Sequence, residues 1–195
     1  MDYLNISKTE KGIRIDGFPE AVKAVRIDSK KSRRFSDMVL HLNDLEFSEE
    51  CLIALNNSNI ERIFQLALWE TAILRYMKCF GGNKGRPSQL NYIKVLKGDK
   101  DGQEIFNYFH NLRNKHFVHD ENSYTQSIPG AIVNDKNSKN KIAKIVSFAA
   151  VGQTLNQINY GNLRKLVEIT NQGLTPVSLK AILSEYEVKW IIGLQ

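Results

Sequence analysis

Residues 60–80 carry apolar side chains on two faces of one predicted helix, and this pattern constrains the fold more than any other feature of the chain. The first apolar stripe consists of Ile60, Ile63, Ala67, Leu74 and Met77. The second stripe consists of Leu66, Trp69, Ile73, Tyr76 and Phe80. Each stripe uses the helical spacing that brings side chains to one face. Because a helix with two such stripes is covered on most sides, the sequence predicts that residues 60–80 form the central helix of a bundle.

Helical periodicity extends over much of the remaining chain. Further helices are predicted over residues 36–46, 48–56, 88–96, 103–118 and 155–171, and from Thr175 onward. Two apolar segments around the polar residues 134–140 predict instead a β-hairpin at about residues 131–150. The predicted fold class is therefore mainly α, a helical bundle with a small β-hairpin inserted after the helix at 103–118.

The length of 195 residues fits one domain with a small appendage. Residues 1–34 are predicted to be an N-terminal extension, in which residues 12–17 alternate like a short strand and the basic residues 30–34 form a flexible connection. Residues 35–195 are the predicted helical domain. The glycine-rich residues 81–87 lack the spacing of a phosphate-binding P-loop, so a linker is predicted there.

Several classes of protein do not fit the composition. No apolar run is long enough to span a bilayer, and residues 1–20 lack the pattern of a secretory signal. The two cysteines, Cys51 and Cys79, each lie in an apolar helical pattern. This predicts buried, reduced thiols in a cytoplasmic protein, and two cysteines cannot build a zinc site by themselves.

The formal net charge of +6 favours polyanionic partners. Part of the positive charge lies in two clusters. One consists of Lys30, Lys31, Arg33 and Arg34, and the other of Lys136, Lys139, Lys141 and Lys144. Each cluster is either a solvated loop or a patch that contacts phosphates without regard to base sequence.

Three of the four histidines lie between positions 110 and 119, at the end of the predicted helix 103–118. On an ideal helix of ~100° per residue, His116, His119 and, at its edge, Arg113 share the apolar face, whereas His110 and Asn114 lie further round. Ionisable groups on a buried face are costly without partners. They are expected to line a cleft or an interface between chains, where histidine transfers protons near neutral pH and arginine grips phosphate.

Each of these residues also has a structural interpretation. His110 fits a solvated surface histidine, and His116 a core histidine bonded to a carbonyl. Arg113 fits a salt bridge to a neighbouring helix, for example to Glu61 or Glu70, and His119 fits a cation at a helix C-terminus.

A metal site is a further interpretation, because His116 and His119 are three residues apart and Asp120 adds an oxygen. No second histidine cluster completes such a site, since only His41 remains. The sequence therefore predicts neither a metal nor a cofactor.

The segment Leu112-Arg113-Asn114-Lys115-His116-Phe117-Val118-His119 resembles the signature of the HEPN superfamily (higher eukaryote and prokaryote nucleotide-binding domains). That signature is an arginine, often followed by asparagine, and then a histidine after four to six residues. The resemblance implies a helical bundle and a metal-independent endoribonuclease, often a toxin or an anti-phage effector. It also implies a homodimer whose two motifs face one composite site, and an antitoxin or other protein partner.

The resemblance also implies roles for individual residues. Arg113 would hold the scissile phosphate, and His119 would act as general base or acid for attack by the RNA 2′-hydroxyl. Asn114 would orient the histidine or the phosphate, and His116 is a second candidate for the catalytic histidine. Many HEPN-like domains bind nucleotides or proteins without catalysis, so the alternative prediction is a non-catalytic binding module.

Overall fold

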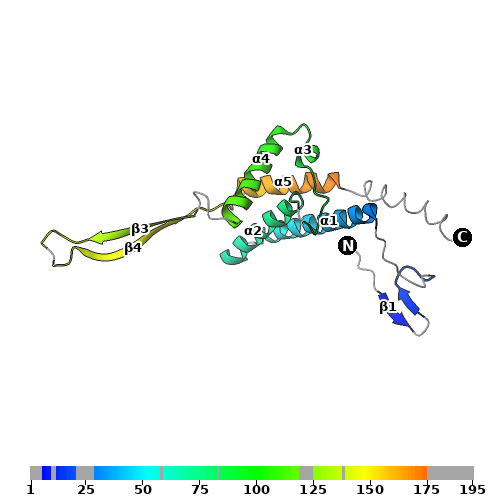
Figure 1. The fold of residues 1–195 in the computed structure, drawn as a ribbon, viewed down its shortest axis with the longest axis horizontal. Coiled ribbons are helices and arrows are strands. Elements are labelled where there is room, and N and C mark those ends of the chain that lie inside the picture. Colours follow the sequence, from blue (N-terminus) through cyan, green and yellow to red (C-terminus); the bar gives the residue numbers. More distant parts are fainter. Residues whose placement is uncertain are drawn as a thin grey trace. The chain divides into compact units, whose positions relative to one another are not determined.

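The structure, a computed structural model, describes residues 6–9, 12–20, 29–57, 59–82, 84–118, 125–137 and 139–174 (Figure 1). The chain divides into two compact units, residues 1–33 and residues 34–195. The predicted last helix, from Thr175 onward, lies outside the described residues. The prediction of a mainly helical chain with a small antiparallel sheet is confirmed.

The first unit contains an antiparallel pair of strands. Strand β1 (Ile6–Thr9) pairs with β2 (Gly12–Ile15), which confirms the strand predicted in this region. A turn follows, in which Gly17 has φ +84°, a conformation that favours glycine.

Helix α1 (Lys30–Ala54) is continuous, so the predicted break between two helices at residues 46–48 is wrong. The second predicted helix starts at Ser48, but Ser48 lies inside α1, where its buried hydroxyl donates to the carbonyl of Ala72 at 2.8 Å. The predicted flexible connection at residues 30–34 is wrong as well. These residues form the first turn of α1, where the Ser29 hydroxyl accepts from the Ser32 amide at 3.0 Å and caps the helix.

The other helices are α2 (Arg62–Lys78), α3 (Tyr92–Val95), α4 (Lys100–Leu112), a π-helical turn η1 (Arg113–Val118), and α5 (Gln157–Gly173). Polar side chains define three of their starts. Asn91, Asp99 and Asn156 each accept a hydrogen bond from the amide three residues later. Such caps satisfy amides that have no partner inside the helix.

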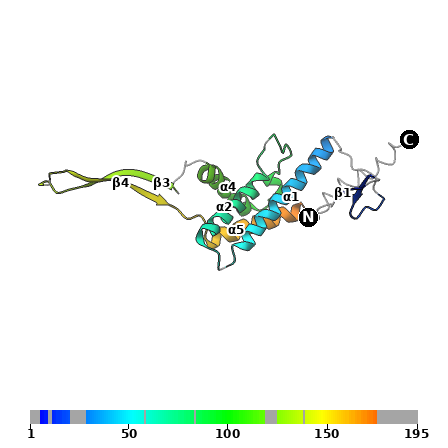
Figure 2. The same ribbon diagram turned by 90° about the horizontal axis from the view of Figure 1, so that it is seen from below.

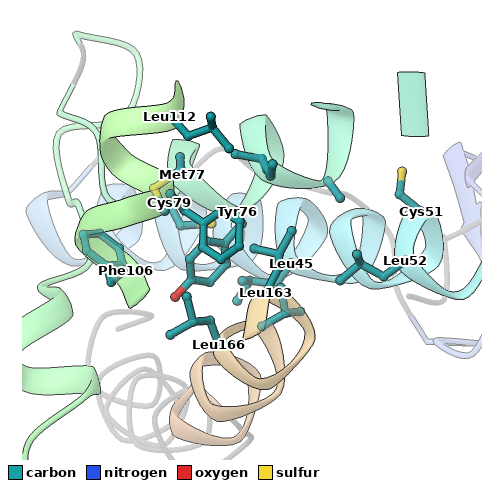
Figure 3. Close-up of a cluster of buried hydrophobic side chains, with 14 of the residues drawn as sticks. Leu45, Cys51, Leu52, Tyr76, Met77, Cys79, Phe106, Leu112, Leu163 and Leu166 are labelled. Carbon is teal, nitrogen blue, oxygen red and sulfur yellow. The ribbon is translucent and has the colours of Figure 1, made fainter. Parts of the chain in front are cut away.

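The core lies between α1, α2, α4 and α5 (Figures 2 and 3). It includes Leu45 and Leu52 from α1, Tyr76 from α2, Phe106 from α4 and Leu163 from α5 (Figure 3). Two buried polar groups at its edges are satisfied by side chains. Trp69 Nε1 donates to Thr154 Oγ1 at 3.0 Å, and the Tyr76 hydroxyl lies 3.2 Å from Thr170 Oγ1.

The second apolar stripe of α2 is packed into this core, whereas of the first stripe Met77 is buried and other members are exposed. Trp69, Ile73 and Tyr76 of the second stripe are fully buried. From the first stripe, Ile63 is 65% exposed and Leu74 is 39% exposed. The prediction that this helix is covered on most sides is therefore wrong for the chain by itself, because α1, α4 and α5 cover one face and leave the other in solvent.

The hairpin consists of β3 (Thr125–Val133) and β4 (Ile142–Val151), which pair antiparallel and extend beyond the predicted residues 131–150. Large apolar side chains are exposed on both of its faces, Ile128 and Phe148 on one and Ile145 on the other. The Phe148 ring lies over Gly130, so that a Cβ added there would overlap the ring.

Cys51 and Cys79 are both free and buried, which confirms the prediction of buried thiols. Burial raises the pKa of the Cys51 thiol and raises that of Cys79 to about 12. Because the thiolate is the reactive species, the raised pKa values disfavour reaction of either side chain at neutral pH. In the described ranges, no helix combines the length and the apolar character that crossing a membrane requires.

Candidate functional site

The histidine-rich segment lies where the backbone of α4 changes from α-helical to π-helical geometry. Leu112 is the last residue of α4, and η1 covers Arg113–Val118. Leu112 is buried and anchors this end of α4, whereas Arg113 is exposed. Single π-helical turns inside helices are rare and occur frequently at functional sites.

Three polar side chains at this junction are linked in series by hydrogen bonds, and we call them the polar chain. Arg113 Nη1 donates to Asn114 Oδ1 at 2.6 Å. Asn114 Nδ2 lies 3.3 Å from Nε2 and 3.4 Å from Nδ1 of His110, within reach of one ring nitrogen. Arg113 and His110 are exposed and Asn114 is half-buried. The polar chain therefore presents a guanidinium, an amide and an imidazole together to solvent.

The arrangement differs from the ideal helical wheel in the position of Arg113. The wheel placed Arg113 at the edge of the apolar face and Asn114 further round. His110 and Asn114 are neighbours because residues four apart meet on a helix. The long Arg113 side chain joins them, and in the described part of the chain it forms no ion pair with Glu61 or Glu70.

The structure describes His116 but not His119. His116 is half-buried, its ring is tilted against Phe117 with centroids 5.1 Å apart, and its Nδ1 is shielded from solvent. This agrees with a position at the margin of the core. His119, predicted as the catalytic histidine, and Asp120 lie outside the described residues. Among the described residues, no group of three or more histidine, cysteine or acidic side chains is arranged to hold a metal ion.

A second polar cluster was missed by the sequence interpretation. Asp44 accepts from Arg75 at 2.8 Å and from Arg86 at 2.7 Å, and Arg86 Nη1 also lies 3.1 Å from His41 Nδ1. Ser88 completes the cluster, because its carbonyl is 2.6 Å from His41 Nε2. Asp44, His41 and Arg86 are buried. The cluster fixes the segment around Arg86, which had been interpreted as a linker, to α1.

A signal for this cluster is present in the sequence. Asp37, His41, Asp44 and Ser48 follow a helical spacing, and all four are buried on one stripe of α1. Polar residues on a buried stripe require partners from another element. Arg86 lies in a glycine-rich segment, and no sequence pattern there indicated that its side chain would be one of those partners.

The partners of His41 define its protonation. The Ser88 carbonyl can only accept, so His41 Nε2 donates to it; the Arg86 guanidinium can only donate, so His41 Nδ1 accepts. The ring is therefore the neutral tautomer with hydrogen on Nε2. Burial, reinforced by the neighbouring Arg86 charge, lowers the pKa of His41 below its ordinary value. This neutral ring and its buried partners Asp44 and Arg86 satisfy one another, so the buried part of the cluster faces inward and holds the fold together.

Stability is expected to fall as pH is lowered below about 6.5, the ordinary histidine pKa. The pKa of His41 is lowered in the folded chain, so the unfolded chain binds the proton first and folding is disfavoured. One such proton changes the free energy of unfolding by at most about 1.4 kcal/mol per pH unit. Urea unfolding between pH 7.5 and 5 measures this slope. His41→Gln, which keeps a donor and an acceptor, should flatten it, and an unchanged slope in that variant would contradict the assignment.

The junction of α4 and η1 is the better candidate for a functional site. The Arg113 guanidinium is exposed and donates to the Asn114 amide, and the His110 imidazole lies at the other end of the polar chain. Guanidinium groups bind phosphate oxygens through paired hydrogen bonds. Comparisons with protein-family models, with curated proteins and with solved structures found no match.

Proposed function

We propose that this protein is a HEPN-like, metal-independent endoribonuclease that acts at the α4–η1 junction. The observation that carries the proposal is the hydrogen-bonded chain from Arg113 through Asn114 to His110, exposed beside a π-helical turn. The resemblance of residues 112–119 to the HEPN signature supports the same site. A toxin or anti-phage effector is the biological role that follows from the proposal.

In the proposed reaction, the 2′-oxygen of one ribose attacks the adjacent phosphorus while His119 removes the hydroxyl proton. The bond from phosphorus to the 5′-oxygen breaks, and that oxygen takes up the proton that His119 removed from the 2′-hydroxyl. The products are a 2′,3′-cyclic phosphate and a 5′-hydroxyl. Arg113 stabilises the charge on the phosphoryl oxygens, and Asn114 holds the guanidinium in place. His116 is the second candidate for the proton transfer, and neither a metal nor a cofactor takes part.

A homodimer is part of the proposal, since two motifs would then form one composite site. The exposed apolar stripe of α2 supports it. Ile63 and Leu74 are exposed on a face that no described helix covers, and η1 packs beside the same helix. Contiguous exposed apolar surface marks sites of association.

Exposed lysine and arginine side chains support the proposal that the anionic partner is RNA. Lys136, Lys139, Lys141 and Lys144 are exposed at the end of the β3–β4 hairpin. Arg33 and Arg34 are exposed in the first turn of α1, which has no acidic residue. RNA binding by this protein is therefore expected to weaken as salt is raised.

The experiment that tests the proposal is incubation of the purified protein with mixed transfer and ribosomal RNA in EDTA. Cleavage that leaves 2′,3′-cyclic phosphate and 5′-hydroxyl ends is expected, and oligonucleotides with 2′-deoxyribose at the cleaved position should remain intact. Cleavage that requires a divalent cation, or that leaves 5′-phosphate ends, would overturn the proposal.

A non-catalytic module that binds a nucleotide or a protein partner is the second candidate function. The exposed apolar side chains on both faces of the β3–β4 hairpin favour it, including Ile128, Ile145 and Phe148. An isolated two-stranded hairpin is marginally stable in water, and a partner that covers one face would stabilise it. This candidate predicts binding without turnover in the EDTA experiment.

A further inference from the structure

A surface pocket of about 500 Å³ lies beside the proposed site, and His110 is common to both. Its walls come from the end of α2, the segment that leads into α3, and one face of α4. Phe80, Tyr92 and Phe106 supply aromatic walls, and Gln89, Asn91 and Asn107 supply side-chain amides. Pockets of ~300–1,000 Å³ hold small ligands.

The aromatic walls form a stacked cluster. Tyr92 and Phe106 are parallel within 3°, with ring centroids 4.3 Å apart. Phe80 contacts Phe106 edge to face at 4.8 Å, and Tyr76 lies behind Phe80 at 5.1 Å. Phe106 is almost fully buried, whereas Tyr92 is half-buried. Phe106 thus supports one face of the Tyr92 ring, and Tyr92 remains partly exposed in the lining of the pocket.

The polar side chains of the pocket are the amides of Gln89, Asn91 and Asn107 and the imidazole of His110. No lysine, arginine, aspartate or glutamate is among the residues that line it. A site with aromatic walls and no lysine, arginine or carboxylate suits a flat group that has hydrogen-bond donors and acceptors better than it suits a phosphate. Amide side chains supply both a donor and an acceptor, which matches the edge of a nucleobase.

The geometry points to a nucleobase-binding subsite in this pocket, which holds a base of the single-stranded RNA whose phosphate lies at Arg113. The inference rests on the proposed function, because it assigns a second contact to the same substrate. The link is the polar chain: His110 lines the pocket and contacts Asn114, and Asn114 binds Arg113. His110 also lies over Phe106, with centroids 6.2 Å apart and planes 20° apart, and so continues the aromatic wall toward the phosphate site. Unstacked bases of single-stranded RNA bind to aromatic side chains in this way.

The test uses a fluorescein-labelled, fully 2′-O-methylated RNA decamer, which binds but cannot be cleaved through a 2′-hydroxyl. Fluorescence anisotropy in EDTA gives its Kd for the wild type and for Tyr92→Ala, Tyr92→Phe and Asn107→Ala. Tyr92→Ala is expected to weaken binding about tenfold because a stacking surface is lost. Tyr92→Phe keeps the ring and should bind like the wild type. Asn107→Ala removes an exposed side chain, so it tests the pocket without disturbing the packing of Tyr92 on Phe106, and should weaken binding several-fold.

Phe18→Ala is the matched control, because Phe18 is an exposed aromatic residue in the first unit that does not line the pocket. If the wild type binds the decamer and both Tyr92→Ala and Asn107→Ala bind equally well, the base subsite is overturned while the proposed nuclease stands. If the wild type binds no RNA at low salt, both are overturned. A decamer with abasic positions that binds as tightly as the normal decamer would also overturn the subsite, because its affinity would not come from bases.

Discussion

Replacing Arg113 with alanine is expected to lower the rate of RNA cleavage by about 100- to 1,000-fold, the usual effect of removing a group that stabilises transition-state charge. The Arg113 guanidinium is exposed and donates to Asn114, so its remaining N–H groups can reach a phosphate. The loss should appear mainly in kcat, since the charge that Arg113 meets develops in the transition state. Single-turnover cleavage of a radiolabelled RNA measures this step directly.

Two matched variants separate the role of Arg113 from that of positive charge alone. Lys115→Ala removes an exposed cation two residues away and should cleave at close to the wild-type rate. Arg113→Lys keeps the charge but loses the planar fork, and a rate between those of wild type and Arg113→Ala is expected. Equal rates for Arg113→Ala and Lys115→Ala would contradict the assignment. Unchanged unfolding curves are expected for all three variants, because both side chains are exposed.

Replacing Arg86 with methionine is expected to lower the free energy of unfolding by about 3 kcal/mol, near the lower end of the cost of breaking a buried ion pair. The Arg86 side chain is 6% exposed and its partner Asp44 is 3% exposed. His41 loses a donor in the same variant. Arg75 still compensates the Asp44 charge, which keeps the cost from being larger.

Arg75→Met is the matched control, because Arg75 binds the same carboxylate at 2.8 Å but its side chain is 41% exposed. Its loss should cost about 1 kcal/mol or less, as for exposed salt bridges. Urea unfolding of the two variants at neutral pH gives both values. Equal losses would mean that burial does not determine the strength of this cluster, and the account of how Arg86 holds its segment to α1 would fail.

Local periodicity in the sequence predicted most helices but not where each begins, since the predicted starts at residues 88, 103 and 155 differ from the observed starts at Tyr92, Lys100 and Gln157. Asn91, Asp99 and Asn156 cap helices because a short polar side chain satisfies amides within its own turn. Such signals depend only on neighbouring residues. Ser48 carries the same kind of side chain, yet it lies in the middle of α1, because its hydroxyl bonds to α2. The partner that decided its role is 24 residues away, and the signal within the sequence was only the helical spacing of Ser48 from Asp44 and His41.

The features of the candidate site that depend on tertiary contacts could not be predicted from the sequence. The helical periodicity of residues 103–118 predicted the helix and placed His110 and Asn114 close together on it. It did not predict the π-helical turn, which changes the angle between successive residues. The pocket beside His110 was not predicted either. It is formed by Phe106 and by Tyr92 from α3, and their stacking depends on the path of the chain between α2 and α4.

The most direct test of the central claim is the cleavage of RNA in EDTA by wild-type protein and by His119→Ala, with the ends of the products determined. We expect the wild type alone to cleave and to leave 2′,3′-cyclic phosphates, and we expect His119→Ala to be slower by about 100- to 10,000-fold, the range of general acid–base catalysis. His116→Ala in the same assay distinguishes the two candidate histidines. Cleavage at the wild-type rate by both histidine variants, or no cleavage by folded wild-type protein, would contradict the claim that residues 112–119 form a ribonuclease motif.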